Sequence, residues 1–462
     1  MLPDMKSGLL LQFLGGLPSD MATRLARAVE MDRLMDGKAL PHQTILDGLR
    51  PVLRGGPVPT RTLTPLRLFC RPFEDILTST RSKKQKASLA RSSVLPTWLW
   101  LSRTLIPGPC QAFVAETKTL ILAQRPDEAN VRAAQFWTLA GQTMREAVAT
   151  EAGRKAARIA LNGDAVLADA EEMALLLLAG PEVCRVQALL PKPVPHLNDD
   201  LLWQLRAIYD ELVSRLPDAA PYVAVLTMNR LARPWEALKL PLQISRSKAD
   251  TLISKTDMGL VGEILFTRME DLQTAIIGTR PSNFDPDKLI EQVSSFAELS
   301  SAIVKEIEVR RDGEWGQRLL RERGAIGDVM DAFMDKALKE LSMALPVQKG
   351  SGSSRPADFS RALDPDRQAS ALRLARLVAG SRHFAAAASF AAKQKAAQDD
   401  MSAYMRRHNE DLVRELRCSD PVRKANAEAQ FEYCVELVTL LMGEEEAEIL
   451  RRRARAALSA AA

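Results

Sequence analysis

The chain is poor in cysteine, histidine and aromatic residues, and each shortage argues against a class of site or fold. Its 462 residues include five cysteines, which are widely spaced and form no CxxC pair. Zinc ribbons and thioredoxin-like redox sites both need such pairs, so the sequence predicts neither. Buried, reduced thiols are the expected state, and we therefore predict a cytoplasmic protein.

Histidine is too sparse to suggest catalysis or metal binding. Four histidines occur, and none belongs to an HExxH or Glu-x-x-His motif. The sequence also lacks Walker A, GxGxxG and GxSxG motifs, and its paired acids have no third acid one helical turn away. We therefore predict no catalytic residue, no cofactor and no metal ligand. A helical enzyme with a site built from dispersed residues would leave no such pattern, and it remains an alternative.

Long apolar runs are missing as well. The longest run, residues 173–180, is far below the ~20 residues that a membrane-spanning helix requires. Near the start of the chain, an acidic residue precedes the short apolar run Leu9–Leu11, and no small-residue cleavage site follows it. These patterns predict no transmembrane segment and no signal peptide.

The residues that the chain has in abundance favour helices. Aromatic residues make up 5% of the chain and β-branched runs are few, whereas Ala, Leu, Arg and Glu recur throughout. Apolar residues repeat at helical spacing in Leu201, Leu205 and Ile208, which follow an N-cap at Asn198. Asp285-Pro286-Asp287 is expected to open another helix. We predict an all-α fold, a multi-helix bundle or stacked helical hairpins, with no sheet of more than two short strands. One long helix is expected over residues 126–161.

Proline and glycine mark the expected boundaries between domains. A proline-rich connector covers residues 190–196 and cannot be helical, and a later segment is dominated by glycine and serine. We expect an N-terminal helical half over residues 1–190, a second helical half over 196–345, a flexible linker over 346–358 and a C-terminal helical unit over 359–462.

Two segments of the chain resemble each other. Leu63–Glu74 and Leu226–Glu236 share an Arg-Pro-aromatic-Glu core, and Arg-Ser-Lys follows each of them. Proline at the first helical position, with an acid two residues later, makes a stable helix start. Duplication of two related halves is one interpretation, and convergence on a good helix start is the other. Duplication predicts that Phe73 and Trp235 occupy equivalent, mostly buried positions.

The strongest feature of the sequence is a basic tract over residues 49–115. It contains eleven bases and two acids, so it carries a net charge of +9, whereas the whole chain carries +5 and the remainder therefore −4. No acid occurs from Ile76 to Ala115, so the bases of that stretch cannot pair within it. Such an uneven charge distribution is typical of a surface that meets an anionic partner.

The densest part of the basic tract precedes two closely spaced tryptophans. On a helix, Trp98 and Trp100 would point about 200° apart, because each residue turns by ~100°. Either that helix is buried on all sides, or one tryptophan faces a partner. The predicted contact residues are Arg81, Lys83, Lys84, Lys86, Arg91, Trp98 and Trp100.

Three interpretations of the basic tract stay open. It is a solvated basic face, a surface for an acidic protein or nucleic acid, or a peripheral contact with an anionic membrane. Nucleic acid is less favoured, because no recognised nucleic-acid-binding motif accompanies the charge. We predict a non-enzymatic bacterial scaffold or adaptor that binds an acidic protein partner through the tract. A nucleic-acid-associated regulator is the alternative function.

Overall fold

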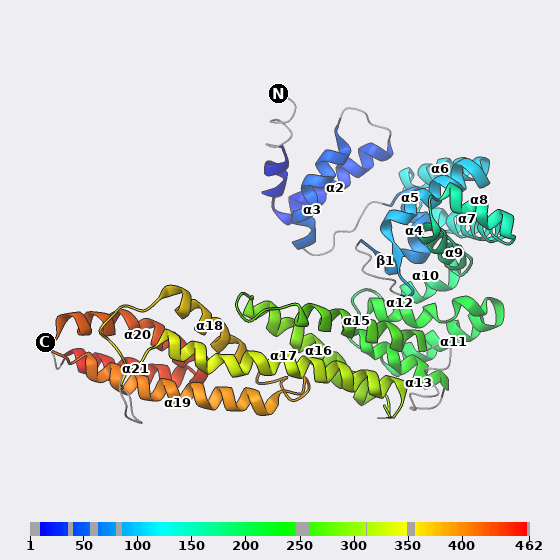
Figure 1. The fold of residues 1–462 in the computed structure, drawn as a ribbon. Helices are drawn as coiled ribbons and strands as arrows, with labels where there is room; N and C mark the ends of the chain where they lie inside the picture. The colour runs from blue at the N-terminus through cyan, green and yellow to red at the C-terminus, as the bar shows by residue number, and fades with distance from the viewer. Residues whose placement is uncertain are drawn as a thin grey trace. The chain divides into compact units, whose positions relative to one another are not determined.

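The computed structural model of the protein is built almost entirely from helices (Figure 1). It describes residues 10–35, 40–55, 63–79, 86–245, 259–310, 312–348 and 356–459. Within those residues, the only strands are β1 (Leu77–Thr78) and β2 (Leu89–Ala90), which pair in parallel. The predicted all-α fold is therefore confirmed.

The chain forms two compact units, Met1–Ala232 and Arg233–Ala462. The boundary between them lies inside the second copy of the repeated segment. The proline-rich connector is not helical, as predicted, and its Val194 forms a parallel bridge with Leu231 inside the first unit. The division into two halves, a linker and a C-terminal unit stays a prediction.

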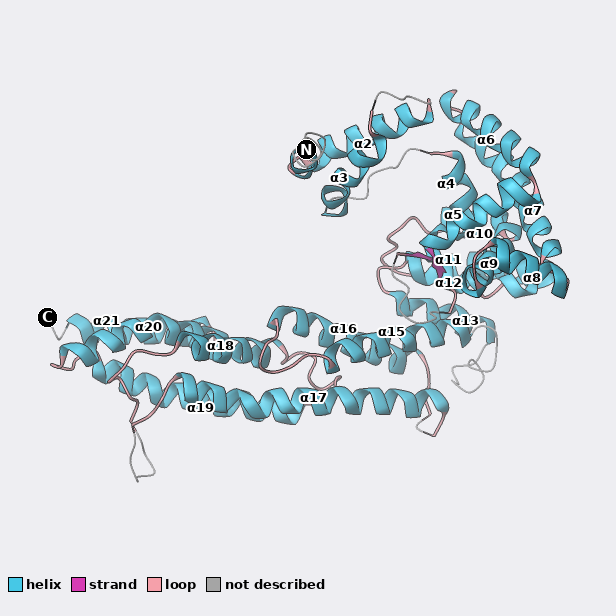
Figure 2. Cartoon of the chain, turned by 45° about the horizontal axis from the view of Figure 1, so that its top comes forward, coloured by secondary structure: helices cyan, strands magenta, loops and turns pink. Residues whose placement is uncertain are grey.

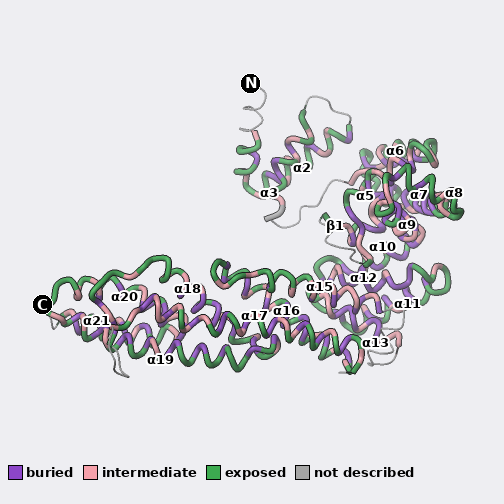
Figure 3. Tube along the Cα trace, in the orientation of Figure 1, coloured by how far each residue is buried: buried purple, intermediate pink, exposed green. Residues whose placement is uncertain are grey.

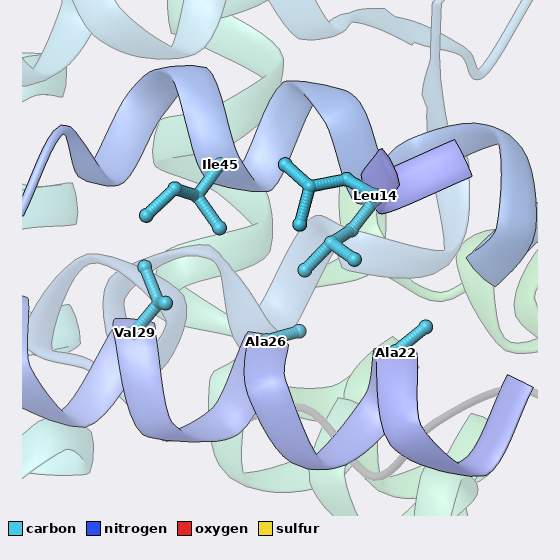
Figure 4. Packing of buried hydrophobic residues seen from close by; sticks show 6 residues of the cluster. Leu14, Ala22, Ala26, Val29 and Ile45 are labelled. Carbon is cyan, nitrogen blue, oxygen red and sulfur yellow. The ribbon is translucent and has the colours of Figure 1, made fainter. Parts of the chain in front are cut away.

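The first unit begins with a small helical hairpin, α2 (Ser19–Leu34) and α3 (His42–Gly55), which follows a helical segment over residues 10–15. At Gly48, an added Cβ would lie 2.8 Å from a methyl carbon of Leu14, so this α3 position needs glycine for close approach. The apolar core of the hairpin consists of Leu14, Ala22, Ala26, Val29, Ile45 and Leu49 (Figure 4).

The rest of the first unit is a cluster of shorter helices. Its elements are α4 (Pro65–Cys70), the 3-10 helix η1 (Arg71–Ile76), α5 (Arg91–Trp100), the π-helical turn η2 (Leu101–Leu105), α6 (Pro107–Leu122), α7 (Pro126–Ala147), α8 (Glu151–Ala160), α9 (Asp164–Leu178), α10 (Gly180–Leu189), α11 (Asp199–Arg215), the 3-10 helix η3 (Pro217–Ala219) and α12 (Tyr222–Arg230). Helices α7 and α9 pack closely, and α6 contacts both α4 and α7. The indole N–H of Trp137 on α7 donates to the Leu68 carbonyl over 3.0 Å, which ties α7 to α4.

The expected single helix over residues 126–161 is wrong, because the chain divides there into α7 and α8. Helix α7 ends at Ala147, and Thr150 then caps a new helix by accepting a hydrogen bond from the Gly153 N–H. A threonine N-cap satisfies an N–H that a helix start leaves unpaired, so it favours a break at this position.

The second unit is dominated by long helices (Figure 2). Its elements are the 3-10 helix η4 (Pro234–Leu238), α13 (Lys239–Ser245), α15 (Gly259–Ile277), α16 (Pro286–Glu306), α17 (Glu314–Ala344), α18 (Pro365–Gly380), α19 (Ala391–Glu415), α20 (Pro421–Met442) and α21 (Glu444–Ser459). Helix α17 packs against both α18 and α19, so helices from both sides of the predicted linker share one core.

Residues 349–355 of the predicted linker lie outside the described residues, whereas its two ends contact each other. The Gln348 N–H donates to the Pro356 carbonyl and the Asp358 N–H to the Pro346 carbonyl, each over 2.9 Å. These two bonds hold the ends of the segment side by side.

Each long helix of the second unit buries one face and exposes the other (Figure 3). Helix α19 buries Met401, Met405 and Leu412 at spacings of four and seven residues, which place them on one stripe. His408 lies on the same stripe and is 4% exposed. The core of this unit therefore contains a titratable group.

The helix starts predicted from capping patterns are confirmed. The Asn198 side chain accepts a hydrogen bond from the Leu201 N–H over 2.9 Å, at the start of α11. Asp285 likewise caps α16, by accepting from the N–H groups of Asp287 and Lys288. Among the described residues, no helix combines the length and the apolar character needed to cross a membrane.

The two resembling segments adopt similar local structures. Each includes all or part of a short α-helix, α4 or α12, that is followed by a 3-10 helix with proline in its first turn, η1 or η4. Phe73 is fully buried and Trp235 is half-buried. Similar local structure agrees with both interpretations of the resemblance, so the duplication stays a prediction.

Candidate functional site

The predicted contact residues do not share one environment. Arg81, Lys83 and Lys84 lie outside the described residues. Lys86 and Arg91 are exposed, which agrees with a role at the surface. The two tryptophans differ, because Trp98 is half-buried whereas Trp100 is 5% exposed.

The basic tract contains two acids, Glu74 and Asp75, and they differ in whether they can pair with its bases. The Asp75 side chain is 7% exposed, and its carboxylate accepts from the Arg230 Nε over 2.8 Å and from the Gln187 amide over 3.3 Å. Arg230 also donates to the carbonyls of Gln187 and Leu190, so it links η1 to the C-terminal end of α10. Glu74, by contrast, is exposed. Of the two acids, Asp75 is therefore directed to α12, away from the bases of the tract.

Some bases of the tract pair with acids from outside it, and others do not. Arg67 forms a bidentate ion pair with Glu30 of α2, with a closest N–O distance of 2.7 Å. In contrast, Lys86, Arg91 and Arg103 are exposed, and none of them forms an ion pair with a described residue. The stretch without acids therefore keeps positive charge at the surface.

A buried carboxylate positions the helix that carries Arg91 and Trp98. Asp169 of α9 is fully buried, and it accepts hydrogen bonds from the Ser93 hydroxyl over 2.6 Å and from the Ala90 N–H over 3.2 Å. Negative charge is favourable at a helix N-terminus, where backbone N–H groups lack partners. Asp169 therefore allows α5 to begin at Arg91 instead of near Pro96, where the proline would suggest a start.

The C-terminal end of α5 continues directly into a π-helical turn. The Ile106 N–H donates to the Leu101 carbonyl over 2.9 Å, which is the wider hydrogen-bonded ring of such a turn. Ile106, with φ −139° and ψ 63°, then interrupts the helical backbone before α6 begins at Pro107. Ser102 lies in this turn, at the edge of a surface hollow described below.

Trp98 rests on an aromatic core. Its ring centroid lies 5.0 Å from that of Phe69, 6.1 Å from that of Phe136 and 6.3 Å from that of Phe113. Phe113 and Phe136 are stacked at 4.1 Å, and both are fully buried. The remaining part of the Trp98 ring lines a cleft on the surface of the first unit. The expectation that Trp98 and Trp100 face different directions is met, with Trp100 on the buried side.

The Trp98 cleft has a volume of about 730 Å³ and is bounded by residues of α2, α3, α4, α5 and α6. Ligand pockets in proteins commonly have volumes of roughly 300–1,000 Å³. Much of its wall is apolar and still accessible, since Leu95 is 56% and Leu66 is 38% exposed. Exposed apolar side chains that gather in a concave surface are typical of an interaction site.

The charged groups around the cleft are mostly basic. The cleft is lined by Arg33, Arg67, Arg91 and Lys118, together with the acids Glu30 and Glu74. The ion pair between Arg67 and Glu30 neutralises one charge of each sign. Arg33 and Arg91 outnumber the remaining acid, Glu74, so the cleft has a net positive charge, which favours an anionic occupant.

A second hollow of about 420 Å³ adjoins the cleft. The two share Trp98, Val114 and Lys118, and the second hollow is completed by Ser102, Cys110, Gln111 and Ala115. Trp98 therefore stands between two depressions on the surface formed by α5 and α6.

The thiols beside these hollows are poor nucleophiles. Burial raises the pKa of Cys70 to about 12, and the nearby Glu74 carboxylate adds to this effect. Burial likewise raises the pKa of Cys110 to about 11. Both side chains are thiols at neutral pH, and the thiolate is the reactive form. The cleft therefore offers recognition through charge and apolar contact.

Part of the cleft could not be found from the sequence. Arg91 and Trp98 were predicted, whereas Arg33 of α2 and Lys118 of α6 were not. Both lie outside the basic tract, and no motif connects them to it. Among the described residues, no group of three or more His, Cys, Asp or Glu side chains is placed to hold a metal ion.

No protein-family model, curated protein or solved structure matches the chain.

Proposed function

We propose that the protein is a non-enzymatic helical adaptor that binds an acidic partner protein through the Trp98 cleft and the adjoining bases of the tract. One observation carries the proposal. Lys86, Arg91 and Arg103 are exposed, no acid lies near them in the sequence, and no described acid pairs with them. Exposed charge of this kind adds little to folding stability, so a role in recognition accounts for it better.

An acidic protein fits the cleft better than the other anionic partners. Protein interfaces combine an apolar centre with charged residues at the rim, and the cleft places Leu66, Leu95 and Trp98 beside Arg91. Phosphate contacts need bases, but they do not need apolar walls. A membrane surface would contact protruding residues more readily than a concave wall.

Charge reversal tests the proposal. Arg91→Glu combined with Arg103→Glu replaces two exposed bases, and because both side chains are exposed we expect the fold to survive. The matched control is Arg145→Glu with Lys155→Glu, which changes the same charge on exposed positions of α7 and α8. Each full-length protein is immobilised and exposed to nuclease-treated extract of the source cells.

We expect wild type and the control to retain the same acidic protein, and the Arg91 and Arg103 variant to lose it. Retention should also weaken as the salt rises from about 0.15 M to about 0.5 M, because salt screens exposed charges. Equal retention by all three proteins would contradict the proposal. Binding that nuclease treatment abolishes would instead favour a nucleic-acid-associated regulator.

A further inference from the structure

We infer that the partner contributes an acidic amphipathic helix, which lies along α5 and α6 with apolar side chains on both sides of Trp98. This inference rests on the proposed function, and it specifies the shape and pattern of the bound segment. It depends on the paired hollows, on the exposed apolar residues and on the position of the bases.

The two hollows define an elongated site. Because they share Trp98, Val114 and Lys118, they follow one another along α5 and α6. Arg91 lines one of them and Ser102 the other, and eleven helical steps separate these residues, about 16 Å at the helical rise. A partner helix of about three turns would match this length.

The apolar walls specify the spacing of the partner's side chains. Leu95 and Leu66 are accessible on one side of Trp98, Ala115 lines the other, and Val114 lines both. A helix that binds in such a site presents apolar residues at positions i, i+3 or i+4, and i+7. Two neighbouring turns of that stripe would then occupy the two hollows.

The bases specify the flanking residues of the partner. Arg33 and Arg91 line the cleft, and Lys118 belongs to both hollows. Glu74 is the one acid of the lining outside the ion pair of Arg67. Acidic residues that flank the apolar stripe would therefore meet opposite charge, whereas basic ones would be repelled.

Strand addition is a less suitable mode of binding. It requires an exposed sheet edge several residues long, and β1 and β2 contain two residues each. The walls of the site are instead helices, and their side chains form a surface into which the side chains of another helix can pack.

Two peptides of identical composition test the inference with the full-length protein. Both have about 15 residues, enough for the estimated three turns plus both ends. The first places leucines on one helical stripe and glutamates beside it, and the second has the same residues in scrambled order. Binding of the labelled peptides is followed by fluorescence anisotropy.

We expect the patterned peptide to bind at least tenfold more tightly than the scrambled one. Leu95→Glu should weaken it by at least tenfold, because a charge then replaces an accessible wall of the cleft. The matched control is Leu139→Glu on α7, where leucine is 41% exposed and lies outside both hollows. It should leave the affinity unchanged. Both substitutions affect exposed side chains, and circular dichroism checks that each variant is folded.

The outcomes separate this inference from the proposed function. If both peptides bind equally and Arg91→Glu abolishes binding, the inferred helical pattern is wrong, but the proposed binding of an acidic partner still stands. If Leu95→Glu and Leu139→Glu behave alike, the inference is also wrong. If Arg91→Glu binds both peptides as wild type does, or neither peptide binds wild type, the proposed function fails together with the inference.

Discussion

His408 makes the stability of the second unit depend on pH. Its side chain is buried on α19, and neither ring nitrogen has a hydrogen-bond partner among the described residues. Burial lowers its pKa from 6.5 to about 4, although the nearby Asp411 carboxylate opposes the shift. The folded protein therefore keeps the imidazole neutral at a pH where an unfolded chain would protonate it.

The size of the effect follows from the two pKa values. Because the folded pKa is the lower one, the unfolded state takes up the proton first as the pH falls. The contribution of the neutral His408 to stability is thus complete above the pKa of the unfolded state. It decreases as the pH falls toward the pKa of the folded state. Between about pH 7.5 and about pH 5, this group alone should lower the free energy of unfolding by about 2 kcal/mol.

The assay compares three full-length proteins at both pH values. Hydrogen exchange of peptides from α19 reports the free energy of opening in this unit, without contributions from the first unit. His408→Gln removes the titrating group, and His383→Gln is the matched control, because His383 is exposed in the same unit. Between pH 7.5 and pH 5, the free energy of opening should fall by about 2 kcal/mol more in wild type and the control than in His408→Gln. Equal losses in all three proteins would refute the reasoning.

Two further predictions concern the buried carboxylates of the first unit. Arg230→Met removes the closer of the two ion pairs of Asp75 and leaves Lys192 at 3.9 Å, so the free energy of unfolding should fall by up to about 3–5 kcal/mol. Adding Asp75→Asn should recover part of this loss. Urea unfolding measures it, and a double variant no more stable than Arg230→Met would contradict the reasoning. Asp169→Asn removes the charge at the start of α5, which should lower the free energy of unfolding by about 2 kcal/mol. Asp164→Asn, exposed on the same helix, is the control, and equal midpoints of thermal unfolding for the two variants would show that Asp169 has no such role.

The features that the sequence predicted correctly are those that depend on neighbouring residues. The N-caps at Asn198 and Asp285 were found because a cap and its helix lie within a few residues. The break between α7 and α8 was missed, although Thr150 is also a local cap. The residues around it are good helix formers, and their propensity concealed the boundary.

The features that the sequence could not predict depend on contacts between distant segments. Ser93 and its acceptor Asp169 lie 76 residues apart, and Arg230 lies 155 residues from Asp75. No periodicity or spacing connects such pairs, because the chain reversals that bring them together are set by the whole fold. The α2 side of the Trp98 cleft was missed for the same reason.

The surface charge of the basic tract depends on one of these distant contacts. Net charge can be counted along a sequence, but the count does not show which charges stay at the surface. Arg230 binds Asp75 beneath η1, so one of the two acids of the tract is buried on the side of α12. Meanwhile Asp169 holds the start of α5, which keeps Arg91 exposed at the rim of the cleft. The positive charge available to a partner is therefore a property of the folded unit as well as of its composition.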